Sequence, residues 1–551
     1  MKMMKKWKKL FACCLSLTIA ATATACGGNA ATDADAGAEV SGAEAVESVV
    51  EETSESAAEG TSEIAEKEPI TISILLPQNN ALRSAMDTTK VWDYIEENTG
   101  IHFEIEVLQS SEQLAGIFAS RDYPDVMARV GVTADQLATA AEAGDVVKLD
   151  DYFDTTLSGW GDFFEEYPNV YRIEQVYDGL YSLPWAMLGH YERGLHTQWL
   201  YNDVWLQELD LEVPTTIAEF TDVLRAVKAA AGTGTIPEDV IPFYFQFGAA
   251  NMMNVFRTFG MPVTESTWLY VDEAGEVVSA SVDPKMKDAL KWLTELYAEG
   301  LIPPEVMTDD ANASLVKVAS DPPQVFCHTA FSNTAVNNLP MAPLDPGTGE
   351  KAYVVNRPFT QNNTYCCIVF NNDSEKVERI LEFLDWAMND EVMLTINYGL
   401  EGVVWDYTED GKYQLNFWEE SPELMAENAE SLGLLNSWFG AFGSKFYENY
   451  YYPDAEVENT REWAIDNIYA DYLPSWDSTY ISAQLDADDQ TLMNQLYTDL
   501  NGCRNETFAR WITGQGDIDA EWDAYVAEME AYGHSEWLEL KQKAYDKATG
   551  R

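Results

Sequence analysis

After a long N-terminal stretch, the chain alternates between short apolar runs and longer segments that are apolar at every third or fourth position. The apolar runs at 70–76, 101–108 and 123–127 predict strands. The segments near 91–95 and over 111–120 have the spacing of amphipathic helices. This β-α-β-α-β order predicts a sheet with helices on both faces.

The alternation continues through the rest of the chain. Thr216 and Glu219 have the spacing of a capping box, which predicts the start of a helix. The run 365–370 predicts a buried strand in which Cys366 and Cys367 point to opposite faces. Further elements are expected as helices at 203–211, 283–299 and 375–389, a strand at 324–328, and a mostly helical part from 421 to 545. An α/β fold with a helical C-terminal extension suits two lobes with a cleft between them.

The N-terminus has the layout of a secretory signal. Five lysines among the first nine residues precede an apolar stretch from Leu10 to about Ala23, which is too short to span a bilayer. The run from Ala23 to Cys26 and Gly27 resembles a bacterial lipobox, in which the cysteine is diacylated and becomes the mature N-terminus. We therefore expect a signal peptide over 1–25 and a lipid anchor on Cys26. The alternative is an ordinary secretory signal that is cleaved after Ala25.

The segment 26–68 is expected to be a disordered linker behind this anchor. From Gly27 to Glu68 it has no aromatic residue and holds twelve acidic residues with one lysine. Such a composition buries too little apolar surface to offset chain entropy, and its like charges repel each other. A solvated tether of this kind allows an anchored domain to stand clear of the envelope.

Composition narrows the possible ligands. The formal charge of −60 and the pI near 4.1 argue against nucleic acid as a partner and make a strongly anionic ligand less suitable. Cys327, Cys366, Cys367 and Cys503 lack metal-ligand spacing and are interpreted as buried apolar residues, so no metal or cofactor is expected. The acids at 486–489 and 517–521 lack the pattern of an EF-hand loop and are interpreted as helix N-caps.

Several stretches resemble one family, the extracellular solute-binding lipoproteins of carbohydrate-type ABC importers. The similar segments are 119–127 (ASRDYPDVM), 144–152 (GDVVKLDDY), 200–216 (LYNDVWLQEL followed by VPTT), 397–403 (NYGLEGV) and 511–546, with its WITG and WDAYV motifs. They follow the family's order over nearly the whole folded part of the chain.

The resemblance implies a periplasmic-binding-protein-like fold of type II, with two hinged lobes that close around an oligosaccharide. It also implies permease subunits of an ABC importer as partners, a monomeric chain and no catalytic residues. Family members often carry Arg or Lys just before the helix that starts at Asp203, where this chain has Tyr201 and Asn202, which favours a neutral sugar. The expected division is 69–184 and 306–368 in the N-terminal lobe, and 185–305 and 369–551 in the C-terminal lobe with the helical extension.

Sugars present flat C–H faces to aromatic rings and hydroxyl groups to carboxylates and amides, so aromatic residues beside amides in loops are candidate ligand contacts. For Trp185 the alternative is a core position beside a proline, and Trp268 could instead support a hairpin. The candidate ligand-binding residues are Trp185, Tyr201, Asn202, Gln246, Asn251, Trp268, Phe331, Asn333, Asn363, Tyr365, Glu401, Trp405, Trp438 and Phe439.

Two other functions compete with solute capture. A secreted glycoside hydrolase needs two suitably spaced carboxylates, but with 93 acidic residues some pair is always available, so this test does not discriminate. No Gly-x-Ser-x-Gly or His-Glu-x-x-His motif is present. A surface adhesin or a sensor for a membrane kinase would share the fold and the anchor.

Overall fold

A computed structural model describes most of the chain beyond the predicted leader and linker. The described residues are 67–77, 88–187, 195–246, 252–263, 267–330, 337–356, 363–417, 422–434, 439–451 and 458–551. The predicted signal peptide, the Cys26 anchor and nearly all of the linker lie outside them. None of the helices described is both long enough and apolar enough to cross a membrane.

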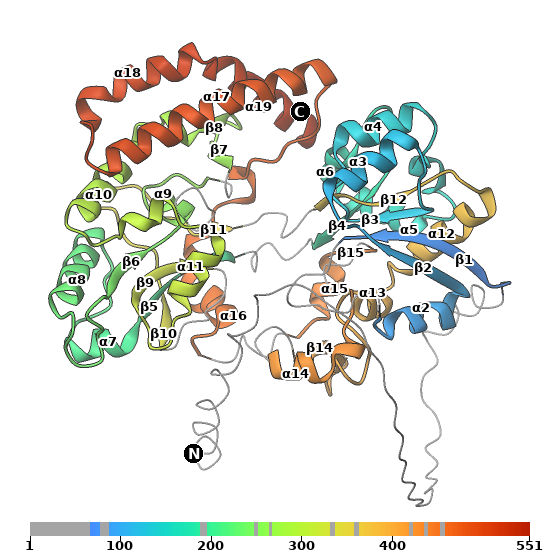
Figure 1. Ribbon diagram of the computed structural model, residues 1–551, viewed down its shortest axis with the longest axis horizontal. Helices are drawn as coiled ribbons and strands as arrows, with labels where there is room; N and C mark the ends of the chain where they lie inside the picture. The colour runs from blue at the N-terminus through green and yellow to red at the C-terminus, as the bar shows by residue number, and fades with distance from the viewer. Residues whose placement is uncertain are drawn as a thin grey trace, which may run out of the picture. The chain divides into compact units, whose positions relative to one another are not determined.

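The first sheet has the strand order β15-β4-β12-β3-β1-β2 (Figure 1). Its strands are β1 (Ile70–Leu76), β2 (Ile101–Val107), β3 (Val126–Ala128), β4 (Leu183–Met187), β12 (Asn363–Val369) and β15 (Ala441–Phe442). β1 pairs in parallel with both β2 and β3, whereas β12 runs antiparallel to its neighbours β3 and β4. The predicted β-α-β-α-β start of the fold is therefore confirmed.

Helices cover both faces of the first sheet, as predicted. They are α2 (Val91–Thr99), α3 (Ser111–Ser120), α4 (Ala134–Glu142), α5 (Ser158–Glu166), α6 (Pro168–Glu174), α12 (Ser374–Trp386) and α13 (Asp390–Asn397). In β12, Cys367 and Val369 face the core formed with α2, α5 and α12, whereas Ile368 and Phe370 face the core formed with α3 and α4. The buried thiols of Cys366 and Cys367 follow from this alternation.

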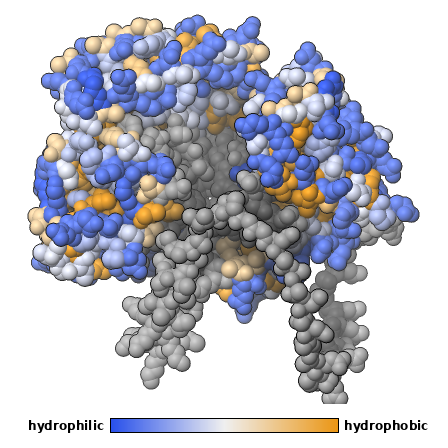
Figure 2. Space-filling model, viewed as in Figure 1, coloured by the Kyte–Doolittle hydropathy of each residue, from blue (hydrophilic) through white to orange (hydrophobic). Residues whose placement is uncertain are grey.

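The second sheet has the order β10-β5-β9-β6, and β11 also pairs with β5. Its strands are β5 (Leu195–Asn202), β6 (Ile241–Tyr244), β9 (Val325–Ala330), β10 (Asn338–Met341) and β11 (Val355–Asn356), and its helices are α7 (Asp203–Glu208), α8 (Ile217–Ala229), α9 (Met253–Thr258), α10 (Lys285–Ala298) and α11 (Ala311–Val318). One large core joins this sheet to the C-terminal helices α17 (Ala487–Ile512), α18 (Ile518–Ala531) and α19 (His534–Thr549). Figure 2 shows a mainly hydrophilic surface over these three helices, as the high net charge suggests.

Shorter elements complete the described chain. They are the hairpins β7 (Leu269–Val271) with β8 (Val277–Ser279) and β13 (Trp405–Tyr407) with β14 (Tyr413–Leu415), and the helices α14 (Pro422–Glu427), α15 (Ser444–Glu448) and α16 (Arg461–Ala464). The stretch 421–486, expected to be mostly helical, contains these short helices, β15 and several single turns. Continuous helix begins only at α17.

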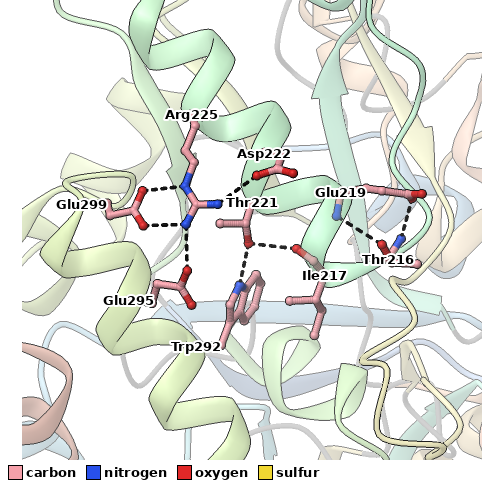
Figure 3. A network of polar contacts seen from close by, with 9 residues as sticks. All are labelled: Thr216, Ile217, Glu219, Thr221, Asp222, Arg225, Trp292, Glu295 and Glu299. Carbon is pink, nitrogen blue, oxygen red and sulfur yellow. Dashed lines mark hydrogen bonds and ion pairs between the residues drawn. The ribbon is translucent and has the colours of Figure 1, made fainter.

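Figure 3 shows how α8 is fixed at its start and along its length. The Thr216 hydroxyl accepts a hydrogen bond from the Glu219 N–H (3.1 Å), and the Glu219 carboxylate accepts one from the Thr216 N–H (3.2 Å), which confirms the predicted capping box. The Trp292 indole of α10 donates to the Thr221 hydroxyl (3.0 Å). Arg225 of α8 forms ion pairs with Glu295 of α10 (2.8 Å) and with Glu299 just after it (2.6 Å), so α8 and α10 are linked by both a buried and an exposed contact.

The acids that were tested as calcium ligands also begin helices. Asp486 accepts a hydrogen bond from the Asp489 N–H (3.1 Å) at the start of α17, and Asp517 accepts one from the Ala520 N–H (3.0 Å) at the start of α18. Their interpretation as N-caps is confirmed. Within the described ranges, no group of three or more His, Cys, Asp or Glu side chains could hold a metal ion.

The strand pairing differs from the expected division of the chain. The segment 306–368 was assigned to the N-terminal lobe, but β9, β10 and β11 pair within the second sheet and only β12 belongs to the first. The segment that follows, assigned to the C-terminal lobe, supplies α12, α13 and β15 to the first sheet and its core. The apolar pattern identifies a buried strand but carries no information on which distant strand it pairs with, and this accounts for the difference.

Candidate functional site

Most strands of the first sheet end at one common edge. Because β1, β2 and β3 are parallel and β12 is antiparallel to β3 and β4, the carboxyl ends of β1 to β4 lie at the same edge as the amino end of β12. Asn363 pairs with Trp185 across β12 and β4, and Tyr365 is two residues farther along β12. Three predicted site residues are thus brought to this edge. Only the backbone of Asn363 is described.

Two residues at this edge have a left-handed backbone although neither is glycine. Arg129, which follows β3, has φ 51°, and Tyr365 has φ 55°. The two strands meet there, since the Arg129 N–H donates a hydrogen bond to the Cys366 carbonyl oxygen (2.6 Å). Such conformations cost free energy and are frequent at ligand sites, where the surrounding structure holds them in place.

A buried carboxyl group supports the unusual backbone of Tyr365. Glu174, at the end of α6, has no exposed surface, and its Oε1 accepts hydrogen bonds from the Ser182 hydroxyl (2.7 Å) and the Tyr365 N–H (2.5 Å). Its Oε2 has no hydrogen-bond partner within the described structure. Burial raises the pKa of Glu174 to about 8, although the bonds from Ser182 and Tyr365 act to lower it. This carboxyl is therefore mostly protonated at neutral pH.

The Trp185 side chain is buried at the same edge, with 1% of its surface exposed. Its indole N–H donates to the Asn397 side-chain oxygen (3.1 Å), and the Asn397 amide in turn donates to the Met393 carbonyl (2.7 Å). These bonds fix the indole plane between β4 and α13. They also satisfy a polar group that would be costly to leave unpaired in the core.

In the second sheet the corresponding edge lies at the carboxyl ends of β6 and β9, which are parallel. Gln246 follows β6 and is half-buried, and its amide donates to the Asp309 carbonyl (3.2 Å). The Asp309 carboxylate accepts hydrogen bonds from the Tyr244 hydroxyl (2.7 Å) and from Lys317. Burial acts to raise the pKa of Asp309, but these two bonds prevail and lower it. The amide group of Gln246 is thus held beside a charged, ordered cluster.

Tyr201 and Asn202 lie at the other end of this sheet. β5 runs antiparallel to β9, and Tyr201 pairs with Cys327. Gln246 is level with Ala330, the last residue of β9, which is about 10 Å from Cys327 along the strand. Asn202 is buried, and its side-chain oxygen accepts a hydrogen bond from the Trp205 N–H (3.2 Å) as the N-cap of α7. Burial raises the pKa of the Tyr201 hydroxyl to about 12, with the charge of Asp203 as a second cause. The structure does not bring these two residues together with Gln246.

Three predicted aromatic contacts are covered by other side chains. Trp268 contacts the Phe256 ring and the Arg504 guanidinium, whose central carbon is 4.2 Å from the Trp268 ring centroid. Trp405 is fully buried, and its indole N–H donates to the Thr395 hydroxyl (3.3 Å). Phe439, the third of these predicted contacts, is also buried. Only 1% of its surface is exposed, because its ring packs against Phe103 and Phe383. Burial of a large apolar ring is favourable, and the glycine next to Phe439 does not prevent it.

The remaining predicted residues divide into two groups. Glu401 is an exposed residue beside the β13–β14 hairpin. Partial desolvation of its carboxyl, followed by the charges of Glu391 and Asp406, raises its pKa. Asn251, Phe331, Asn333 and Trp438 lie outside the described residues.

Sequence reasoning missed Arg129 and Glu174. Arg129 follows the run DVM that was used to recognise the family, but only the observed φ angle distinguishes it. Glu174 is one of 93 acidic residues, and nothing in its local sequence indicates that its carboxyl is buried. What the two sheet edges offer is the partly exposed Tyr365 ring and the half-buried Gln246 amide, both held in place by hydrogen bonds, and such groups suit the recognition of a polar ligand.

Comparisons with known proteins identify the family and the fold of the chain. Residues 80–394 match the family described as bacterial extracellular solute-binding protein. The chain is 25% identical over 470 residues to the fructooligosaccharide ABC transporter substrate-binding protein FusA of Streptococcus pneumoniae serotype 4, covering 82% of this chain and 86% of FusA. It is 24% identical over 215 residues to lipoprotein LipO of Bacillus subtilis, covering 36% of this chain and 42% of LipO.

Solved structures share the fold. S. pneumoniae FusA in complex with kestose has a TM-score of 0.71 at 22% identity, covering 87% of this chain and 100% of that one. The HMO binding ABC-transporter associated solute-binding protein from Bifidobacterium longum infantis has a TM-score of 0.69 at 20% identity, covering 88% and 99%. The predicted two-lobed α/β fold with C-terminal helices is thus confirmed. Because the family match covers more than half of the sequence, the chain belongs to the bacterial extracellular solute-binding protein family.

Proposed function

We propose that this protein is the solute-binding lipoprotein of an ABC importer and that it captures a neutral oligosaccharide for delivery to the permease. The observation that carries the proposal is the likeness to FusA, which covers more than four fifths of both chains and is therefore not confined to one shared segment. FusA is described as a fructooligosaccharide substrate-binding protein. If both lobes contact one ligand, the closed form binds it more tightly than the open form does, and the ligand therefore shifts the protein toward the closed form.

The two strand edges support a saccharide ligand. Tyr365 is partly exposed on a rigid backbone at the edge of the first sheet, and the Gln246 amide is ordered at the edge of the second. A ring face and an amide are groups that recognise the C–H faces and the hydroxyls of a sugar. Both side chains were predicted from the sequence as ligand contacts and remain proposed contacts.

The charge of the protein favours a neutral sugar over an acidic one. The chain has a formal charge of −60. An anionic sugar would meet repulsion from this surface. A uronate-rich oligosaccharide is therefore the less suitable ligand.

Calorimetric titration tests the ligand class. The purified protein is titrated with fructo-oligosaccharides and with neutral mannan, xylan and glucan oligosaccharides, and an acidic oligouronate serves as the matched charged control. We expect saturable binding of at least one neutral series with 1:1 stoichiometry. Binding of the uronate alone, or of no sugar at all, would contradict the proposal.

A secreted hydrolase and a surface sensor are the competing functions. Prolonged incubation with each bound oligosaccharide, followed by chromatography, distinguishes a hydrolase from a solute-binding protein, because a solute-binding protein leaves the sugar intact. Deletion of the gene distinguishes a sensor from an importer subunit. An importer subunit is required for uptake of labelled sugar, whereas a sensor is required only for the transcriptional response to it.

The lipid anchor is proposed from the N-terminal sequence and is supported by the similarity to a protein described as a lipoprotein. Cys26 would carry the diacylglycerol and hold the protein on the outer face of the cell membrane. Replacing Cys26 by Ala should move the protein from the membrane fraction to the culture medium and abolish labelling by palmitate. Retention of the variant on the membrane would count against the anchor.

A further inference from the structure

A groove of about 870 Å³ lies between helices that the proposed contacts do not involve. One wall is formed by α4 and by the turn 176–179, and the other by the start of α17 and the end of α19. Its volume is within the range of small-molecule sites, roughly 300–1,000 Å³. The walls are joined at one side, where Ile173 of α6 packs against Ala548 of α19 in a small buried cluster.

The groove contains the most exposed aromatic side chain in the part of the chain that the structure describes. Tyr177 has 62% of its surface exposed, whereas Tyr532, on α18's far end, has 41%. Tyr177 also has a left-handed backbone, with φ 53°, which is costly for a residue of its size. An exposed ring on a strained turn contributes little to the protein's own core, and its position in a groove makes it a candidate stacking surface for a ligand.

The turn that carries Tyr177 is held rigidly. The backbones of Val176 and Gly179 exchange two hydrogen bonds of 3.1 and 3.2 Å across it. The Asp178 carboxylate accepts hydrogen bonds from the Tyr181 hydroxyl (2.5 Å) and from the Lys148 ammonium (3.2 Å). A side chain at Gly179 would collide with Lys148, since a Cβ there would lie 2.5 Å from its Cε. A ring on such a base can be contacted at little cost in conformational entropy.

The charged residues of the lining are Asp135, Glu142, Asp178 and Asp486, with Lys543 and Lys547, and the remaining residues are neutral polar or apolar. Asp135 and Glu142 of α4 face the groove from one wall, and Asp486 and Lys543 from the other. Lys543 is already paired with Asp486 (3.3 Å) and with Asp489. Carboxylates around an aromatic ring are suited to accept hydrogen bonds from sugar hydroxyls, and they would repel an anionic ligand.

The groove adjoins the strand edge of the first sheet. Gln175 and Val176 line it, and they directly follow Glu174, whose carboxyl holds the Tyr365 N–H. Burial raises the pKa of Tyr365, and the next causes are the charges of Glu174 and of Asp135, which also lines the groove. A ligand that reaches Tyr365 can therefore extend into the groove.

We propose that this groove binds the outer units of an oligosaccharide whose first units occupy the strand-edge site, with the ring of Tyr177 as the stacking surface. This inference rests on the proposed saccharide function and adds a chain-length preference to it. The site as a whole would select oligomers over disaccharides. Affinity should rise with chain length until the groove is filled.

The test measures affinity against chain length by calorimetry. Fructo-, β-1,4-manno- and β-1,4-xylo-oligosaccharides of two to six units are titrated into the wild type, Tyr177→Ala, Tyr177→Phe and the control Tyr532→Ala. The control removes a ring that is also exposed but lies outside the groove. Thermal unfolding of each variant verifies that the fold is retained.

We expect Tyr177→Ala to weaken binding of the longest sugars about 5- to 30-fold, with disaccharide binding unchanged. Tyr177→Phe, which keeps the ring, and Tyr532→Ala should match the wild type at every length. Equal affinities of Tyr177→Ala and wild type for the longest sugars, or an equal loss at all lengths, would overturn the inference while leaving the proposed function intact. Failure of the wild type to bind any of the three series would overturn the proposed function and the inference with it.

Discussion

The carboxyl group of Glu174 accepts a 2.5 Å hydrogen bond from the backbone N–H of Tyr365, which lies 191 residues farther along the chain. This bond connects the end of α6 to the amino-terminal part of strand β12 and holds Tyr365 in its left-handed conformation. Because Glu174 is fully buried, its charge state affects both the stability of the protein and the geometry of the strand edge. Glu174 is thus a positioning residue, not a ligand contact.

Ionisation of Glu174 should destabilise the folded state. Its pKa rises from 4.5 to about 8 on folding, because burial disfavours the charged form. The unfolded chain therefore releases this proton first, and the free energy of unfolding falls as the pH rises from about 5 to about 8, by roughly 2–4 kcal/mol. Glu174→Gln cannot ionise, so its free energy of unfolding should not fall in this way, and the variant should become more stable relative to the wild type as the pH rises over this range. Urea unfolding at four pH values measures both curves.

Glu165→Gln is the control for this experiment, since Glu165 is an exposed glutamate on the neighbouring helix α5. This variant should follow the wild-type pH dependence throughout. If Glu174→Gln also follows the wild type, then the buried carboxyl does not stay protonated as described.

The capping box at the start of α8 should contribute a measurable share of stability. Thr216→Ala removes the hydroxyl that accepts from the Glu219 N–H and should lower the free energy of unfolding by about 1 kcal/mol. Thr216→Ser keeps the hydroxyl and should differ from the wild type by a few tenths of that amount. Urea denaturation compares the three proteins, and an equal loss in both variants would show that the threonine methyl group, not the cap, matters.

Local sequence was sufficient for the elements that depend on local interactions. The helix Ser111–Ser120 and the capping box of α8 follow from spacing and capping residues within one short segment. The opposite faces of Cys366 and Cys367 follow from the two-residue period of a strand.

Contacts between distant segments could not be predicted in this way. Phe439 was predicted as a ligand contact, but its ring is covered by Phe103 and Phe383, which are far from it in the sequence. The pairing of β9 between β5 and β6 and the burial of Glu174 depend equally on residues that no local pattern identifies. The family resemblance supplied the fold class but not these individual neighbours.

Replacing Asn202 tests whether its side chain acts as a helix cap or as a ligand contact. Its side chain caps α7 and is fully buried, so Asn202→Ala should destabilise the protein by about 1 kcal/mol. Oligosaccharide affinity should stay within about twofold, because the residue is at the far end of β5 from Gln246. Asn202→Asp retains an acceptor for the Trp205 N–H and should recover part of the stability. A large loss of affinity without loss of stability would instead support the contact predicted from the sequence.

Gln246 and Gln324 form a matched pair for testing which sheet edge meets the ligand. Both are half-buried glutamines whose amides donate to an aspartate residue, Asp309 at 3.2 Å and Asp239 at 3.1 Å. Gln246 follows β6, whereas Gln324 precedes β9, so they lie at opposite ends of the same two parallel strands.

Replacing either glutamine by Ala removes one hydrogen bond and should lower the free energy of unfolding by about 1 kcal/mol in both variants. Only Gln246→Ala should also weaken binding of the best neutral oligosaccharide, by about 5- to 15-fold, since an amide that bonds a sugar hydroxyl is lost only there. Calorimetric titration of the two variants with the same sugar gives the comparison. Equal affinities would exclude the carboxyl edge of the second sheet from the binding site, and a selective loss in Gln324→Ala would place the ligand at the opposite edge.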